Sequence, residues 1–158
     1  MALRRIPYSD LEPLVREHLS VEEDAGTVFL TGKLRAAKRR GYLTRGELEA
    51  VCRWKSARAI RYIRANSHYR VRTVTGAALA TGNEERRLEA LLQLDGVSVA
   101  MASAVLTLLD PKRYGVIDIR VWQLLYAMGA VTENPKGVQL RAKNWLQFLA
   151  ILRRLSSS

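Results

Sequence analysis

Two apolar runs that meet at a glycine, between residues 88 and 109, constrain the fold more than any other stretch. Both runs have the spacing of helices, and Gly96 at their junction can adopt a positive φ or approach another segment closely. No alternating strand pattern of useful length occurs elsewhere in the chain. We therefore predict an all-α fold that contains a helical hairpin at about residues 84–109, with the second helix starting at Val97.

The N-terminus of the second hairpin helix is a candidate anion site. Its first N–H groups should lack backbone acceptors, and the helix dipole favours negative charge at the same place. A hairpin of this kind can bind a DNA phosphate, and such a contact does not depend on the base sequence. The alternative is an ordinary helical hairpin in an all-α core. The residues that we expect to supply the phosphate contact are Gly96, Val97, Ser98 and Ala100.

A carboxylate follows the hairpin, because Asp118 comes directly after the apolar pair Val116 and Ile117. Aspartate is a good N-cap, so one interpretation is a structural cap worth roughly 1 kcal/mol. The other interpretation is a functional acid group, and the two roles are compatible.

Together, the segments LDGVSVAMAS and VIDIRV resemble the helix-hairpin-helix DNA glycosylase superfamily of the endonuclease III type. That family has an L-P-G-V-G hairpin and a V-D-x-H-V segment with an essential aspartate. Gly96 matches the hairpin glycine and Asp118 matches the catalytic aspartate, and the resemblance covers residues 85–126 well. It implies a compact multi-helix domain in which a catalytic-aspartate helix follows the hairpin. It also implies a base-excision-repair enzyme that flips a damaged base out of double- or single-stranded DNA and cleaves its N-glycosidic bond.

The chain departs from the family pattern at several of these positions. Asp95 replaces the hairpin proline, Ser98 replaces the second glycine, and Arg120 replaces the histidine. Members with AP lyase activity carry a Schiff-base lysine on the second hairpin helix, where this chain has Ala100. The resemblance is therefore to a small, divergent bacterial member, either monofunctional or using a relocated lysine. The best candidate for that amine nucleophile is Lys55, which lies beside an aromatic residue at a helix junction.

Length and charge support one basic domain. The chain has 158 residues, enough for a single domain over residues 1–158, and we expect a monomer. Lys and Arg outnumber Asp and Glu by 26 to 15, and the net charge of +11 favours a polyanionic partner. A non-catalytic DNA-binding module and a protein-interaction domain with incidental charge remain alternatives. Candidate phosphate contacts are Lys38, Arg39, Arg40, Arg58 and Arg61, and candidate base-pocket residues are Tyr42, Trp54, Tyr62, Met101 and Trp122.

Several function classes are disfavoured. The chain has no run of ~18 apolar residues and no apolar signal segment near residue 1, so we expect no membrane partner. Cys52 is the only cysteine, which excludes an internal disulfide, a four-cysteine iron–sulfur cluster and a cysteine-based zinc site. We expect no metal and no cofactor, and a reducing cytoplasmic location at the nucleoid.

Local patterns outside the hairpin predict helix ends and core positions. Gly41 should end a helix, and Thr44 with Glu47 three residues later has the pattern of a capping box at the start of the next. A helix is expected over residues 57–65, with a serine before it as a possible cap. The apolar residues 28–30 are expected in the core.

Overall fold

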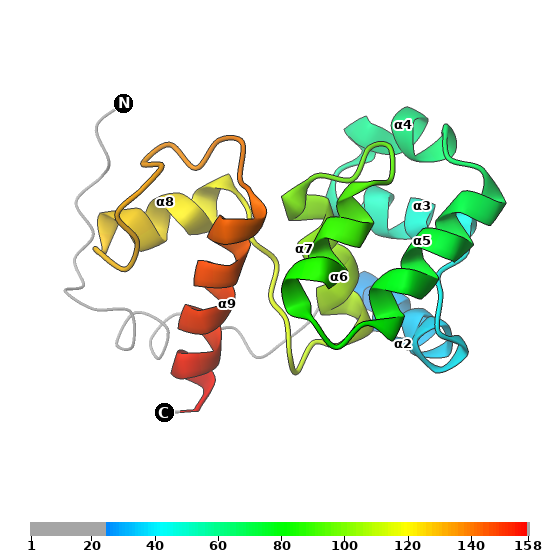
Figure 1. Ribbon diagram of the computed structural model, residues 1–158, viewed down its shortest axis with the longest axis horizontal. Helices are drawn as coiled ribbons and strands as arrows, with labels where there is room; N and C mark the ends of the chain where they lie inside the picture. The colour runs from blue at the N-terminus through cyan, green and yellow to red at the C-terminus, as the bar shows by residue number, and fades with distance from the viewer. Residues whose placement is uncertain (1–24, 158) are drawn as a thin grey trace. The chain divides into compact units, whose positions relative to one another are not determined.

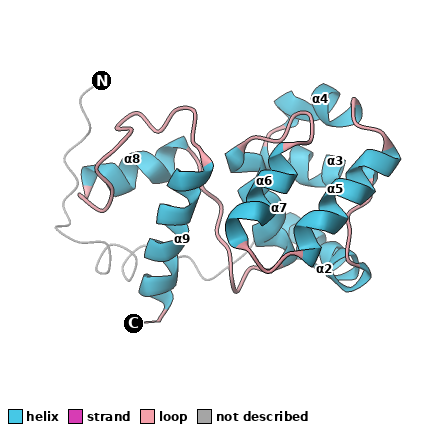
Figure 2. Cartoon of the chain, in the orientation of Figure 1, coloured by secondary structure: helices cyan, strands magenta, loops and turns pink. Residues whose placement is uncertain are grey.

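The computed structural model describes residues 25–157, and in this range the chain is helical without strands (Figure 2). The predicted all-α fold is therefore confirmed. The chain divides between Val116 and Ile117 into two compact units, and each is described by itself. Within residues 25–157, no helix is both long and apolar enough to span a membrane.

The unit before Val116 is organised around its last helix. That helix, α7, packs against α2, α3 and α6, while α5 packs on α6 and α4 on α3 (Figure 1). The helices of this unit are α2 (Ala25–Arg40), α3 (Arg45–Lys55), the 3-10 helix η1 (Ala57–Ala59), α4 (Ile60–Arg64), α5 (His68–Ala80), α6 (Glu84–Leu92) and α7 (Val99–Leu109).

The sequence of α7, VAMASAVLTLL, explains its central position. A helix that is apolar on every side is stable only when it is buried, and nine of its 11 residues are buried. Ala102, Ser103 and Ala104 are small and fully buried, so neighbouring helices can approach closely. The Ser103 hydroxyl donates a hydrogen bond to the carbonyl of Ala100 at 2.7 Å, which satisfies this buried polar group.

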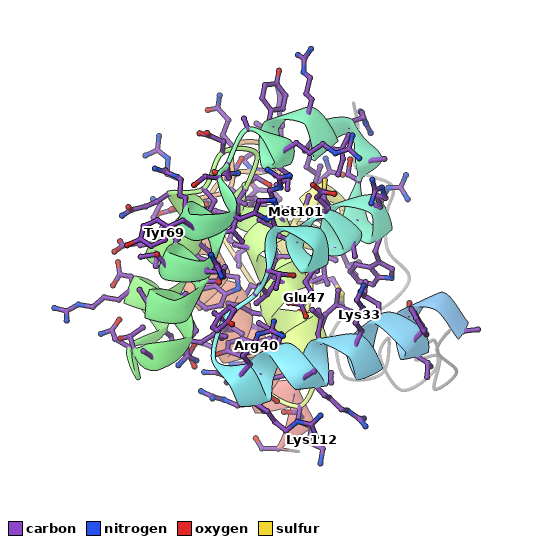
Figure 3. The ribbon with its side chains drawn as sticks, turned by 90° about the vertical axis from the view of Figure 1, so that its right-hand side faces the viewer. Lys33, Arg40, Glu47, Tyr69, Met101 and Lys112 are labelled. Atoms are coloured by element: carbon purple, nitrogen blue, oxygen red, sulfur yellow. The ribbon has the colours of Figure 1, made fainter. Side chains whose placement is uncertain are left out.

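The junction between α2 and α3 agrees with its sequence signals. Gly41 ends α2 with a φ of +92°. The predicted capping box is present: the Glu47 N–H donates to Thr44 Oγ1 at 3.2 Å, and the Thr44 N–H donates to Glu47 Oε1 at 2.8 Å. The Arg40 guanidinium also pairs with the Glu47 carboxylate, and Figure 3 shows these two side chains between α2 and α3.

Two local predictions were only partly right. The buried face of α2 is formed by Leu30, Leu34 and Ala37, so Val28 and Phe29 point away from the core and are 54% and 76% exposed. The helix expected over 57–65 is instead η1 followed by the short helix α4, and the serine before it makes no side-chain cap bond.

The second unit contains α8 (Ile119–Ala127) and α9 (Ala142–Ser156). Trp122 and Trp145 are fully buried and form its core. The Trp122 Nε1–H donates to the carbonyl of Asn134 at 2.8 Å, which ties the connecting loop to α8. Gly137 has a φ of +65° and lies so close to α8 that an added Cβ would be 2.9 Å from the Ile119 carbonyl oxygen. Glycine is therefore required at this point of the loop.

Candidate functional site

The turn between α6 and α7 begins α7 with a capped end. Ser98 is the N-cap, and its hydroxyl oxygen accepts a hydrogen bond from the Met101 N–H at 3.2 Å. The apolar pattern suggested a start at Val97, but the helix begins two residues later, at Val99. The Val97 N–H donates to the carbonyl of Leu94 at 3.3 Å and is used within the turn. This corrects the expectation that the Val97 N–H is open to a ligand.

The same turn lies directly on α4. Gly96 has a φ of +79°, and a Cβ added there would be 2.9 Å from Tyr62 Cβ and 3.0 Å from the backbone nitrogen of Ile63. Both reasons for which the sequence favoured glycine apply here, the positive φ and the close approach. A side chain at this position would push the turn away from α4.

A buried amide also joins the turn to α4. Asn66, which follows α4, is 1% exposed and hydrogen-bonds both the N–H and the carbonyl of Asp95, each at 3.0 Å. Sequence reasoning missed this residue, because an asparagine next to the N-cap Ser67 has the pattern of an ordinary loop.

The turn and Lys55 line one hollow of about 490 Å³. This is within the size range of small-molecule sites. One wall comes from the end of α3, from η1 and from α4, and the other comes from the turn and the start of α7. The residues that line it are Lys55, Ser56, Ala59, Tyr62, Gly96, Val97, Ser98, Ala100 and Met101.

The hollow thus brings together Lys55 and the turn between α6 and α7, which the sequence singled out separately. Lys55 is partly exposed and is the charged residue among those lining it. Met101 is 3% exposed and provides an apolar surface. Tyr62 is 49% exposed, and the Arg61 guanidinium lies 4.6 Å from the centre of its ring. The hollow therefore combines an amine, an apolar surface and an aromatic ring beside a cation, which suits a flat ligand attached to an anion.

Tyr62 was a candidate pocket residue from the sequence, and its neighbours Ser56 and Ala59 in the wall share a spacing with it. They recur every three residues, with the same spacing as the basic residues Arg58 and Arg61 on the neighbouring face. Arg58 and Arg61 are exposed and do not line the hollow, but the Arg61 guanidinium contacts the ring of Tyr62, which does.

Three of the predicted base-pocket residues do not line this hollow, namely Trp54, Tyr42 and Trp122, the last of which lies on α8. The Trp54 Nε1–H donates to Thr27 Oγ1 at 3.0 Å, so its indole is held against α2. Tyr42 lies under Arg40, whose guanidinium carbon is 4.6 Å from the ring centre.

The basic residues at the end of α2 form a separate group from those near the hollow. Lys38 Nζ pairs with the Asp110 carboxylate at 3.1 Å, directly after the C-terminus of α7. The turn lies at the N-terminus of α7, and an 11-residue helix is about 16 Å long. Lys38 therefore lies about one length of α7 from the turn. Arg39 is its exposed neighbour, while Arg40 is engaged with Glu47.

Asp118 lies in the second unit and caps α8. Its Oδ1 accepts a hydrogen bond from the Val121 N–H at 2.8 Å, so the structural role that the sequence suggested is present. The side chain is partly exposed. Its catalytic role stays a prediction. Trp122, a candidate pocket residue on the same helix, is fully buried in the core of its own unit.

Among residues 25–157, no group of three or more His, Cys, Asp or Glu side chains could hold a metal ion. Comparisons of the chain with protein-family models, with curated proteins and with solved structures found no match.

Proposed function

We propose that this protein is a DNA glycosylase that flips out a damaged base and cleaves its N-glycosidic bond, with Lys55 as an amine nucleophile. The observation that carries the proposal is the shared hollow, which Lys55 lines together with the α6–α7 turn. Ala100, which occupies the place of the lysine in lyase members of the resembling family, lines the same hollow. Lys55, at the end of α3, thus lines the same space that a lysine at position 100 would line.

The chemistry follows from this arrangement. The lone pair of the Lys55 amine forms a bond to C1′ of the flipped nucleotide, and the C1′–N glycosidic bond breaks. The base leaves with the bonding electrons and takes up a proton. The C1′–O4′ bond then breaks as the remaining N–H proton of Lys55 moves to O4′, which gives an imine between Lys55 and C1′ that borohydride reduces to a stable amine.

Binding of the DNA backbone is the second part of the proposal. The N–H groups of Val99 and Ala100 lie in the first turn of α7, where they have no intrahelical acceptor, and they face a helix end that favours anions. The exposed residues Arg58 and Arg61, on the segment that carries Ala59 and Tyr62, contact neighbouring phosphates in this proposal. Each phosphate neutralised on duplex DNA contributes about −0.9 to the slope of log affinity against log salt concentration.

The family resemblance assigns the catalytic carboxylate to Asp118, which lies in the other unit from the hollow, and this part of the proposal is tested by itself. The sugar gains oxocarbenium character as the base departs, and a fixed negative charge stabilises that cation. Asp118→Asn tests the charge separately from the cap, because asparagine is an equally good N-cap. We expect the variant to keep its stability and DNA affinity and to lose excision. Excision at the parent rate would leave Asp118 as a cap alone.

The decisive experiment uses a panel of duplexes and single strands, each with one lesion, followed by alkali to reveal abasic sites. Borohydride is then added during reaction with the lesion that is cut. A trapped protein–DNA adduct is expected for the parent and for Lys33→Ala, which removes an exposed lysine of α2 (Figure 3). No adduct is expected for Lys55→Ala. Excision without any adduct indicates a monofunctional glycosylase, and an adduct that persists in Lys55→Ala removes Lys55 from the mechanism.

A non-catalytic helix-hairpin-helix DNA-binding protein is the second candidate. The observation that favours it is the use of the Asp118 carboxylate as the cap of α8, since that role needs no chemistry. This candidate predicts salt-dependent duplex binding with no excision of any lesion in the panel. An all-α domain with incidental charge predicts no affinity for DNA at low salt.

A further inference from the structure

Asn66 makes an unusual set of hydrogen bonds for a residue in a connection between helices. Its Oδ1 accepts from the Asp95 N–H at 3.0 Å, and its Nδ2 donates to the Asp95 carbonyl at 3.0 Å and to the Ile63 carbonyl at 2.9 Å. The side chain is 1% exposed. The amide therefore pairs with both backbone groups of one residue of the α6–α7 turn, without competition from water.

The orientation of this amide is fixed by its partners. The Nδ2 group faces carbonyl oxygens, which can only accept hydrogen bonds, and Oδ1 faces an N–H, which can only donate. Aspartate cannot replace it, because one carboxylate oxygen would face those carbonyls. Alanine would leave the N–H and the carbonyl of Asp95 without these partners.

The position of this pairing links the two walls of the hollow. Asn66 follows α4, which carries Tyr62, and Asp95 precedes Gly96, which lies against Tyr62 and the backbone of Ile63. The Arg45 guanidinium also donates to the Asn66 carbonyl, at 3.4 Å, which connects the junction to α3. The buried amide of Asn66 and the absence of a side chain at Gly96 thus both contribute to the spacing between Tyr62 and the N-terminus of α7.

We propose that Asn66 is the positioning residue of the α6–α7 turn: by pairing with the backbone of Asp95, it holds the N-terminus of α7 at the distance from Tyr62 and Lys55 that a bound nucleotide needs. The proposal rests on the proposed function for its ligand. Asn66 itself touches no ligand and acts through the turn.

The control variant is Thr75→Val. The buried Thr75 hydroxyl accepts a hydrogen bond from the Leu43 N–H at 2.9 Å, and so ties another connection, between α2 and α3, to α5. Neither Thr75 nor Leu43 lines the hollow. Valine keeps the shape and removes the hydrogen bond, so this variant loses stability in a similar way at a place that does not affect the hollow.

The first measurement is amide hydrogen exchange of the Asp95 N–H. In the parent we expect this amide to be protected although Asp95 is exposed, because its hydrogen bond is to a buried group. Two ordinary hydrogen bonds change an opening equilibrium by about tenfold or more, so Asn66→Ala should speed this exchange at least that much. Thr75→Val should leave it unchanged. The measurement on the parent needs no variant, so it tests whether the Asp95 N–H is held in a hydrogen bond even if Asn66→Ala does not fold.

The second measurement is affinity for a lesion duplex at several salt concentrations. Asn66→Ala should bind about tenfold more weakly than Thr75→Val under conditions where both are folded. Rapid Asp95 exchange in the parent, or exchange unchanged by Asn66→Ala, overturns the inference whatever the DNA result. Faster exchange with an affinity equal to that of Thr75→Val also overturns it. A parent that binds no DNA overturns the proposed function and the binding half of the inference, and the exchange data alone then decide whether Asn66 holds the turn.

Discussion

Replacing Gly96 with alanine should destabilise the protein through two separate effects. The residue has a φ of +79°, and a Cβ there would lie 2.9 Å from Tyr62 Cβ and 3.0 Å from the Ile63 nitrogen. The left-handed conformation costs a non-glycine residue roughly 1–2 kcal/mol. Overlap with a side-chain atom close to the backbone and with the backbone itself costs roughly 1–3 kcal/mol more, because neither can move freely.

Alanine also reduces the entropy of the unfolded chain, which returns about 0.4–1 kcal/mol. The net loss is therefore roughly 2–4 kcal/mol for Gly96→Ala. For a chain of this length, each kcal/mol lowers Tm by about 2–4 °C. We expect a fall in Tm of roughly 5–15 °C, measured by thermal unfolding and by urea titration.

Two other glycines separate the contributions. Gly41 has a φ of +92° with nothing within 4 Å of its added Cβ, so Gly41→Ala carries the conformational cost alone, roughly 1 kcal/mol net. Gly32 lies inside α2 with open space around its added Cβ, and Gly32→Ala should stabilise by about 0.5–1 kcal/mol. If Gly96→Ala is as stable as Gly41→Ala, the turn does not lie against α4 and the account of the hollow fails.

Three further predictions follow from individual side chains. Asp95→Asn removes a carboxylate next to the proposed phosphate site, so duplex affinity at low salt should rise about two- to fivefold in fluorescence anisotropy; a fall would argue against phosphate binding at this turn. Burial raises the pKa of the Cys52 thiol above its ordinary value, so less thiolate forms near pH 8 and a thiol reagent should label the folded protein slowly but the urea-unfolded protein rapidly. Burial, and the hydrogen bond to Glu84 at 2.7 Å, raise the pKa of Tyr114 in the folded state. The stability linked to this phenol is therefore present below about pH 10 and is lost as pH rises further, so between pH 9 and 11 urea titrations should show a larger loss for the parent than for Tyr114→Phe. Equal losses would contradict the assignment.

Signals between neighbouring residues predicted much of the local structure. The capping box of Thr44 and Glu47 needs only two residues three positions apart, and Gly41 needs only its own backbone freedom, and both were read from the sequence. The apolar run after Gly96 predicted a buried helix, but its first residue was placed at Val97. The hydroxyl of Ser98 determines the actual start. An N-cap residue has a non-helical backbone, so the helix begins at the residue after it.

Features that depend on segments far apart in the chain were not predictable in the same way. Phe29 is apolar yet 76% exposed, because the buried face of α2 is decided by what packs against it. Asn66 pairs with a residue 29 positions away, and no periodicity in the sequence announces a buried amide in a connection. The sequence did single out Lys55 and the hairpin turn separately. Their presence around one hollow depends on how α3 packs against α7, which is a property of the folded unit.

Ala100 and Lys55 line the same hollow from different helices, so this fold offers two points of attachment for one amine. A sequence motif that requires lysine on the second hairpin helix covers position 100 but not position 55. A comparison of which residues line the same hollow, rather than of their positions in the sequence, would group chains that place a lysine there from different helices. The exchange Lys55→Ala with Ala100→Lys asks directly whether the two routes are interchangeable.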